Sequence, residues 1–116
     1  MSQLDDALDR IRSHDGVEHV LVLGRDGLLI QHAGGDLDAE TVSAMVPGVA
    51  QAASALGSAA GTGAAGTVVV RLESGVAIVE ELSDDVLLAV LLRAGTGFAA
   101  LLAELARSRG ELALLV

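Results

Sequence analysis

Three apolar segments that follow one another almost without a gap place the strongest constraint on the fold. Only two or three residues separate each segment from the next. Their β-branched and apolar residues are typical of strands, and a parallel pair would need a connection of roughly a dozen residues. The segments therefore predict consecutive antiparallel strands at Thr67–Glu73, Val76–Leu82 and Val86–Arg93.

The remainder of the chain supplies two more predicted strands and three predicted helices. The strands, Val17–Leu23 and Leu28–Ala33, form a hairpin around the turn GRDG. The helices are expected from the cap Ser2 to about His14, from about Ala39 to Ala60 after the cap Asp38, and from the cap Thr96 to Gly110. The tail ELALLV has no predicted role. These elements predict one α+β domain over residues 1–116, with a mainly antiparallel five-stranded sheet.

The side chains of each strand predict its place in the sheet. The strands 17–23 and 86–93 are the most continuously apolar, so we expect them in the middle. The strand 28–33 contains Gln31 and His32, and the strand 67–73 contains Arg71. We therefore expect these two strands at the edges.

Composition excludes several classes of function. A formal net charge of -9, the absence of Lys and a single aromatic residue argue against a nucleic-acid partner. The absence of Cys removes disulfides, thiolate nucleophiles and Cys-type zinc sites. The polar, acidic start is unlike a signal peptide, and the uncharged stretch 41–70 is too rich in Gly, Ser and Ala to favour a transmembrane helix. We expect a cytoplasmic domain with no transmembrane segment.

Two Gly-rich segments imitate nucleotide-binding loops. GTGAAG (61–66) follows a predicted helix and precedes a strand, whereas a phosphate-binding loop requires the reverse order. GTGFAA (95–100) does lie between a strand and a helix, but no further strand with an acidic residue follows it. An anion at the start of the last helix stays a minor alternative. We expect no bound cofactor.

No cluster of residues predicts catalysis or metal binding. The His residues lack metal-ligand spacing, although His19 and His32 can face each other across the hairpin as a pH-sensitive pair. The acidic pair Glu80-Glu81 is expected to be solvated. Arg25 is interpreted as a turn residue, with an arginine finger into a partner protein as the alternative. We therefore expect no enzyme, no catalytic residue and no metal site.

The predicted helix after Asp38 lacks the charged outer side of an ordinary surface helix. No charged residue occurs from Thr41 to Val70, although the chain contains 16 acidic residues. One apolar stripe is expected against the domain's own sheet: Val42, Met45, Val46, Val49, Ala53, Leu56 and Ala60. The opposite side is small and nearly neutral: Ser43, Ala44, Pro47, Gln51, Ser54, Ala55 and Ser58. Because small side chains let another backbone approach closely, we predict that a second copy covers this side through a two-fold contact. An Ala-rich sequence bias is the alternative.

The order and spacing of these segments resemble the Roadblock/LC7 family over nearly the whole chain. The resemblance rests on GVEHVLVLGRDGLLIQHAG (16–34), LDAETVSAM (37–45) and LLAVLLRAGTGFAALLAEL (87–105). The organisation is similar to that of the bacterial, MglB-like members. Gly97-Phe98-Ala99 departs from the Asn and Gly that members often carry near the start of the last helix.

The resemblance implies a layered α/β/α arrangement and a homodimer. The central helix is expected on one face of the sheet and the other two helices on the opposite face. In the implied dimer the central helices pack together and the strands 67–73 pair edge to edge. The expected interface is Ala44, Pro47, Gln51, Ser54, Ala55 and Ser58 on the helix, with Thr67, Val69 and Arg71 on the strand.

The resemblance also implies the function. Such proteins are typically non-catalytic platforms that bind small Ras-like GTPases, so we predict a homodimeric, non-enzymatic GTPase regulator or scaffold. One alternative is an architectural adaptor that links larger subunits through the open edge of strand 28–33. Another is a small-ligand sensor with a pocket between the sheet and the helices. A heterodimer with a related chain also stays open.

Overall fold

The computed structural model describes residues 2–116 and contains one five-stranded sheet. The strands are β1 (Val17–Gly24), β2 (Leu29–Gly34), β3 (Thr67–Leu72), β4 (Gly75–Glu81) and β5 (Val86–Arg93). Their order across the sheet is β2-β1-β5-β4-β3, and every neighbouring pair is antiparallel. The apolar pattern therefore correctly predicts β2 and β3 at the edges and β1 and β5 in the interior.

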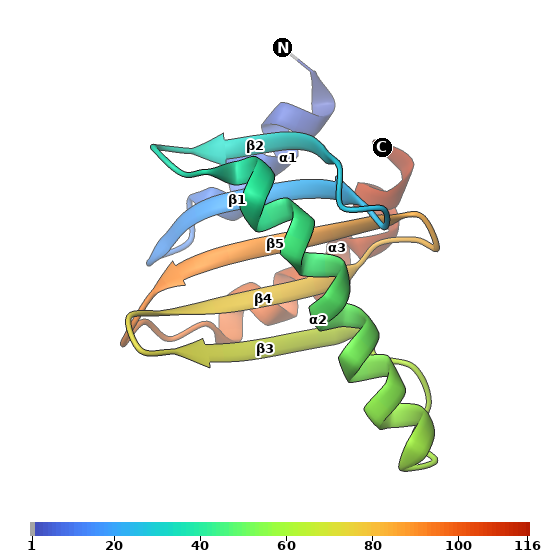
Figure 1. Ribbon diagram of the computed structural model, residues 1–116. Helices are drawn as coiled ribbons and strands as arrows, with labels where there is room; N and C mark the ends of the chain where they lie inside the picture. Colours follow the sequence, from blue (N-terminus) through green and yellow to red (C-terminus); the bar gives the residue numbers. More distant parts are fainter. Residues whose placement is uncertain (1) are drawn as a thin grey trace.

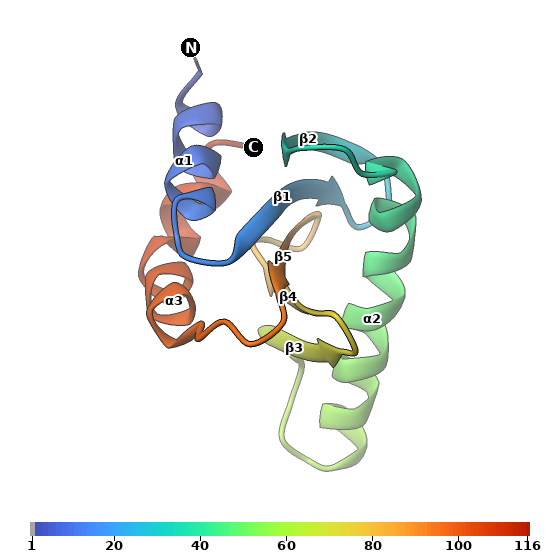
Figure 2. The same cartoon turned by 90° about the vertical axis from the view of Figure 1, so that its left-hand side faces the viewer.

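The sheet lies between two layers of helix. Figure 2 shows α2 (Ala39–Ala59) on one face of the sheet, and α1 (Gln3–Arg12) with α3 (Ala99–Leu114) on the other. Each face has its own core. Leu8, Ile11 and Leu105 belong to the core under α1 and α3, and Leu21, Val46 and Leu87 belong to the core under α2. The strands β1 and β5 are apolar on both faces because both faces are covered.

Side-chain caps define the starts of α1 and α2. The Ser2 hydroxyl oxygen accepts a hydrogen bond from the Asp5 backbone N–H at 3.0 Å. The Asp38 carboxylate accepts from the Thr41 hydroxyl at 2.7 Å and from the Thr41 backbone N–H at 3.3 Å. These hydrogen bonds lower the pKa of Asp38, and the bond from the Thr41 hydroxyl has the larger effect. Both predicted caps are confirmed, and each satisfies a backbone donor of the first helical turn.

The predictions for the last helix are wrong at both ends. Phe98 is the N-cap of α3 and makes no side-chain capping bond, whereas Thr96 lies against Gly16. Gly16 has a φ of 83°, and an added Cβ would lie 2.3 Å from the Thr96 methyl carbon. At the other end the helix continues through Gly110 and buries Leu112, which is 2% exposed. That burial offsets the helix-weakening effect of glycine, about 1 kcal/mol.

The helix α2 crosses the sheet diagonally, and its C-terminal end extends beyond β3 (Figure 1). The GTGAAG loop that follows folds back along these last turns. The Thr62 N–H donates to the Gly57 carbonyl at 2.8 Å, and the Ala65 N–H donates to the Ser54 hydroxyl at 3.1 Å. A Cβ at Gly57 would lie 1.9 Å from the Gly63 carbonyl oxygen, so the loop needs glycine there. This loop packs on a helix end and is not the start of a phosphate-binding helix.

Within residues 2–116, no helix is long and apolar enough to cross a membrane.

Candidate interaction surface

The outward-facing side of α2 carries large apolar side chains in place of charges. Met45 is 67% exposed and Leu56 is 70% exposed. Together with their exposed neighbours they form what we call the α2 outer side: Ala44, Met45, Gly48, Val49, Gln51, Ala52, Ala55, Leu56 and Ser58. An exposed surface of this kind, uncharged over its whole length, is unusual for a helix that faces only water.

The predicted apolar stripe of α2 is therefore only partly right, because Val46 is buried as expected but Met45 and Leu56 are exposed. The side against the sheet is built from smaller residues, and Ala39, Ser43, Val46 and Ala50 are the buried ones. Ser43, predicted on the open side, is 0% exposed and donates its hydroxyl to the Gly27 carbonyl at 2.8 Å. Small side chains let the helix lie close to the sheet, and this hydrogen bond satisfies the one buried hydroxyl. Met45 and Leu56 are consequently left on the outside.

The residues predicted for the helix part of a dimer interface have different degrees of exposure. Ala44, Gln51, Ala55 and Ser58 are exposed. Pro47 and Ser54 are half-buried, and the Ser54 hydroxyl already accepts the bond from Ala65. The four exposed residues lie on the α2 outer side, and Ser54 helps to hold the loop that follows.

The strand β3 presents an unpaired edge next to this helix. It pairs with β4 on one side, and on the other side it has no neighbouring strand within residues 2–116. The predicted interface residues Thr67 and Arg71 are exposed, but their side chains turn to the α3 side of the sheet. Thr67 donates to Glu80 at 2.7 Å, and the Arg71 guanidinium lies 5.7 Å from the centre of the Phe98 ring. Val69, 40% exposed, lies between them on the strand, so this edge offers backbone groups together with an apolar side chain.

The diagonal course of α2 leaves part of its own face of the sheet incompletely covered. Three residues that are neighbours across the strands are only half-buried here: Val70 on β3, Ala77 on β4 and Leu91 on β5. Leu72, at the end of β3, is 57% exposed. Leu37, Leu72 and Leu91 line a shallow hollow of about 350 Å³ here. The domain therefore has an exposed apolar helix side, an open strand edge and a partly bare sheet corner on adjoining elements.

A comparison with family models agrees with this architecture. The model of the Roadblock/LC7 domain matches residues 3–92, which is most of the chain. The chain belongs to the Roadblock/LC7 family.

Solved structures extend the likeness to the whole Roadblock/LC7 domain. The Roadblock/LC7 domain from Streptomyces avermitilis has a TM-score of 0.84 and 25% sequence identity, over 96% of this chain and 95% of that chain. Myxococcus xanthus MglB has a TM-score of 0.85 and 16% identity, over 98% of this chain and 94% of that chain. MglC from the same organism has a TM-score of 0.71 and 20% identity, over 97% and 98%. At these identities MglB and MglC support the fold alone. No curated protein matches the chain.

The hairpin of this Roadblock/LC7 domain brings two histidines together. His19 Nδ1 lies 3.1 Å from His32 Nε2, and the ring centres are 5.3 Å apart. Burial lowers the pKa of His19, and the nearby His32 lowers it further. Glu18 opposes this shift and Arg12 adds to it. One neutral ring donates to the other, and two protonated rings would repel each other.

We expect this His pair to make the domain less stable in mild acid. Because the folded-state pKa of His19 is below its ordinary value of 6.5, the fold favours the neutral ring. The stabilisation is complete above that ordinary value, and it is lost as the pH falls through the lower, folded-state pKa. Urea unfolding between about pH 5 and pH 8 should show a smaller pH dependence for His19→Gln than for the parent. An identical pH dependence in both proteins contradicts the prediction.

A buried ion pair joins α3 to the edge of the sheet in this Roadblock/LC7 domain. Glu80 is 2% exposed, so its predicted solvation is wrong. Arg109 on α3 donates to one carboxylate oxygen of Glu80, and Thr67 on β3 donates to the other. Glu80 points to the same face of β4 as Val76 and Ile78, where an unpaired carboxylate would be costly.

Arg25 is committed to contacts within its own chain. Its guanidinium contacts Glu81 at 2.8 Å and donates to the backbone carbonyls of Ser83 and Asp84. Its backbone N–H donates to the Asp85 carbonyl at 2.8 Å. Arg25 therefore ties the β1–β2 turn to the β4–β5 turn, which supports the turn interpretation over the arginine finger.

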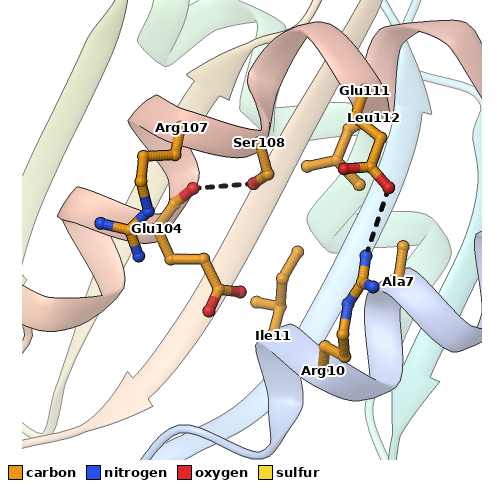
Figure 3. Close-up of a pocket in the computed structure, with 8 residues that line it drawn as sticks. All are labelled: Ala7, Arg10, Ile11, Glu104, Arg107, Ser108, Glu111 and Leu112. Carbon is orange, nitrogen blue, oxygen red and sulfur yellow. Dashed lines mark hydrogen bonds and ion pairs between the residues drawn. The ribbon is translucent and has the colours of Figure 1, made fainter.

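A cleft between α1 and α3 is the pocket that a ligand-sensor role would use. It measures about 300 Å³, and Ala7, Ile11 and Leu112 form its apolar part. Figure 3 shows Arg10 and Glu111 paired across it, at 3.7 Å, and the Ser108 hydroxyl bonded to the Glu104 carbonyl at 2.8 Å. Arg10, Ser108 and Glu111 thus have partners within the protein, and both members of the Arg10–Glu111 pair are largely exposed. The cleft does not favour a particular ligand.

Over residues 2–116, no group of three or more His, Asp or Glu side chains has the geometry of a metal site.

Proposed function

We propose that this Roadblock/LC7 domain is a non-catalytic homodimer that binds a small Ras-like GTPase in the cytoplasm and modulates its nucleotide cycle. The observation that carries the proposal is the α2 outer side, which is exposed, apolar at Met45 and Leu56, and free of charge. Family membership adds support for a role in protein interaction.

A two-fold contact through α2 and β3 suits the shape of the domain. A two-fold axis that passes through the edge of β3, perpendicular to the sheet, would relate the two copies. Rotation about this axis places the end of α2 that extends beyond β3 (Figure 1) against the other copy. This end carries Leu56, and the surface it meets is the partly bare corner at Leu72 and Leu91. The same operation places the open edges of the two β3 strands side by side. An interface of roughly 800 Å² per copy is typical of stable complexes.

The dimer then offers a GTPase a rigid surface, and its effect on nucleotide hydrolysis or exchange is positional. The paired α2 helices bind one conformation of the GTPase's switch segments more tightly than the others. The population of that conformation therefore rises. Arg25 supplies no finger in this mechanism because its guanidinium is tied to the β4–β5 turn.

The test first searches the genes beside this one for a small Ras-like GTPase and then uses that purified protein. Single-turnover GTP hydrolysis and nucleotide release are measured with and without the purified domain. We expect one of the two rates to change by at least about fivefold, which corresponds to a change of about 1 kcal/mol in its activation free energy.

Matched variants test whether the effect on the GTPase requires the α2 outer side. Ala55→Arg alters the α2 outer side, whereas Ala106→Arg alters an exposed alanine on α3, across the sheet. The first variant should lose the effect and the second should keep it. If the parent domain alters neither the rates nor the nucleotide affinity, the regulator role is refuted and the adaptor alternative gains.

A further inference from the structure

A second exposed apolar surface lies at the opposite end of the sheet, along β2. Leu28 is 70% exposed and Ile30 is 49% exposed. We use the name β2 lip for these two residues together with the open edge of Leu29–Gly34. The β2 lip is separate from β3 and from the C-terminal half of α2, as Figure 1 shows.

The Leu28 end of the β2 lip is held in place by hydrogen bonds. The Leu28 N–H donates to the Asp26 carboxylate at 3.0 Å, and the Leu28 carbonyl accepts from the Gly24 N–H at 2.9 Å. The turn is also bonded to α2, because the buried Ser43 donates to the Gly27 carbonyl. Beside Leu28 lies a hollow of about 470 Å³ between the turn and the first turns of α2. The exposure of Leu28 therefore belongs to an anchored turn next to an open hollow.

The edge itself lacks the usual protection against strand addition. Proteins commonly protect exposed edges with charged residues or Pro, yet β2 (LIQHAG) contains no Lys, Arg, Asp, Glu or Pro. A register shift opposite Val22 and Leu23 leaves Ile30 without a partner in β1. Such bulges turn a side chain in a new direction, which agrees with the outward exposure of Ile30.

The surroundings of the β2 lip are acidic. Between residues 26 and 40 the chain contains four acidic residues and neither Lys nor Arg. The four are Asp26, Asp36, Asp38 and Glu40, and all are exposed. Glu18, at the start of β1, lines a hollow with Asp36, and Arg12 lines the same hollow. Arg25 is bound to the β4–β5 turn.

We propose that the β2 lip binds an extended, basic-flanked segment of another protein, which adds to β2 as a further strand. Backbone hydrogen bonds to the open edge supply affinity, and apolar side chains of the segment cover Leu28 and Ile30. Lys or Arg at its ends face the acidic residues around the lip. A second copy of this chain is disfavoured as the occupant, because a two-fold contact at this edge brings like charges together.

The test uses a synthetic peptide of about nine residues, with alternating Val and Thr in the middle and Lys at both ends. One control peptide has Glu in place of Lys, and another has N-methyl groups that block backbone hydrogen bonding on alternate residues. Binding is measured by hydrogen exchange of the full domain. We expect the Lys peptide alone to slow exchange of the β2 amides by at least about tenfold.

A pair of protein variants isolates the β2 lip from the proposed dimer surface. Leu28 and Leu56 are both 70% exposed, so Leu28→Lys and Leu56→Lys are closely matched. Leu28→Lys should abolish the protection and Leu56→Lys should preserve it. The proposal is overturned if the Lys peptide does not bind, if the Glu peptide binds equally, or if protection appears at β3. It is also overturned if Leu28→Lys lowers the molecular mass that the protein has in solution without peptide, since a second copy is then the occupant of the β2 lip. The proposed function does not rest on Leu28, so the two ideas can fail separately.

Discussion

Replacing Ala55 with arginine is expected to leave the domain folded but to convert the dimer to monomers. Ala55 is exposed in the isolated chain and lies beside Leu56 on the α2 outer side. In the proposed two-fold contact, a long charged side chain replaces a methyl group on the α2 outer side, which has no charge of its own because no charged residue occurs from Thr41 to Val70. A buried, unpaired charge costs about 3 kcal/mol or more, which corresponds to at least about a hundredfold weaker association.

Sedimentation velocity at micromolar concentration measures the outcome directly. The parent should sediment as a dimer and Ala55→Arg as a monomer, with unchanged circular dichroism. Ala106→Arg introduces the same side chain at an exposed alanine of α3 and should remain dimeric. A dimeric Ala55→Arg protein would place the interface elsewhere. If the parent protein itself sediments as a monomer, the two-fold contact in the proposed function is refuted.

The second large effect is expected at the ion pair between α3 and the sheet. Arg109→Met leaves the carboxylate of Glu80, 2% exposed, without its cationic partner. The arginine side chain is 40% exposed, so we expect a loss near the lower end for a buried pair, about 3 kcal/mol. Urea unfolding measures this loss, and the melting temperature should fall by roughly 10 °C.

Two controls separate the ion pair from general effects of substituting α3. Arg107→Met removes an exposed arginine from the same helix and should cost little. Adding Glu80→Gln to Arg109→Met removes the buried charge and should recover part of the lost stability. If Arg109→Met is no more destabilising than Arg107→Met, then solvent already compensates the charge of Glu80.

Local patterns determine much of the architecture of this domain. The strand β5 has the predicted bounds, and the other strands differ from prediction by one residue at one or both ends. Tight turns permit only antiparallel neighbours, and the polar residues of β2 and β3 favour edge positions. The caps Ser2 and Asp38 are correctly predicted because a capping bond joins residues close in sequence.

The candidate surface is predictable only in part. The absence of charge from Thr41 to Val70 is visible in the sequence and directs attention to α2. The side of α2 that faces outward is not visible, because both sides are apolar or small and either can pack on a sheet. Burial of Ser43 rather than Met45 depends on how closely the helix approaches the strands and on the distant carbonyl of Gly27.

The sequence by itself thus determined the elements, the class of fold and the uncharged character of α2, because these depend on residues near one another in the chain. The tertiary structure alone decided the features that depend on contacts between residues far apart in the chain. It buried Glu80 against Arg109, tied Arg25 to Glu81 and the β4–β5 turn, and left Leu28 exposed beside β2. In each case the partners or the covering elements come from separate segments, and a side chain's burial and charge state follow from which segments the fold brings together.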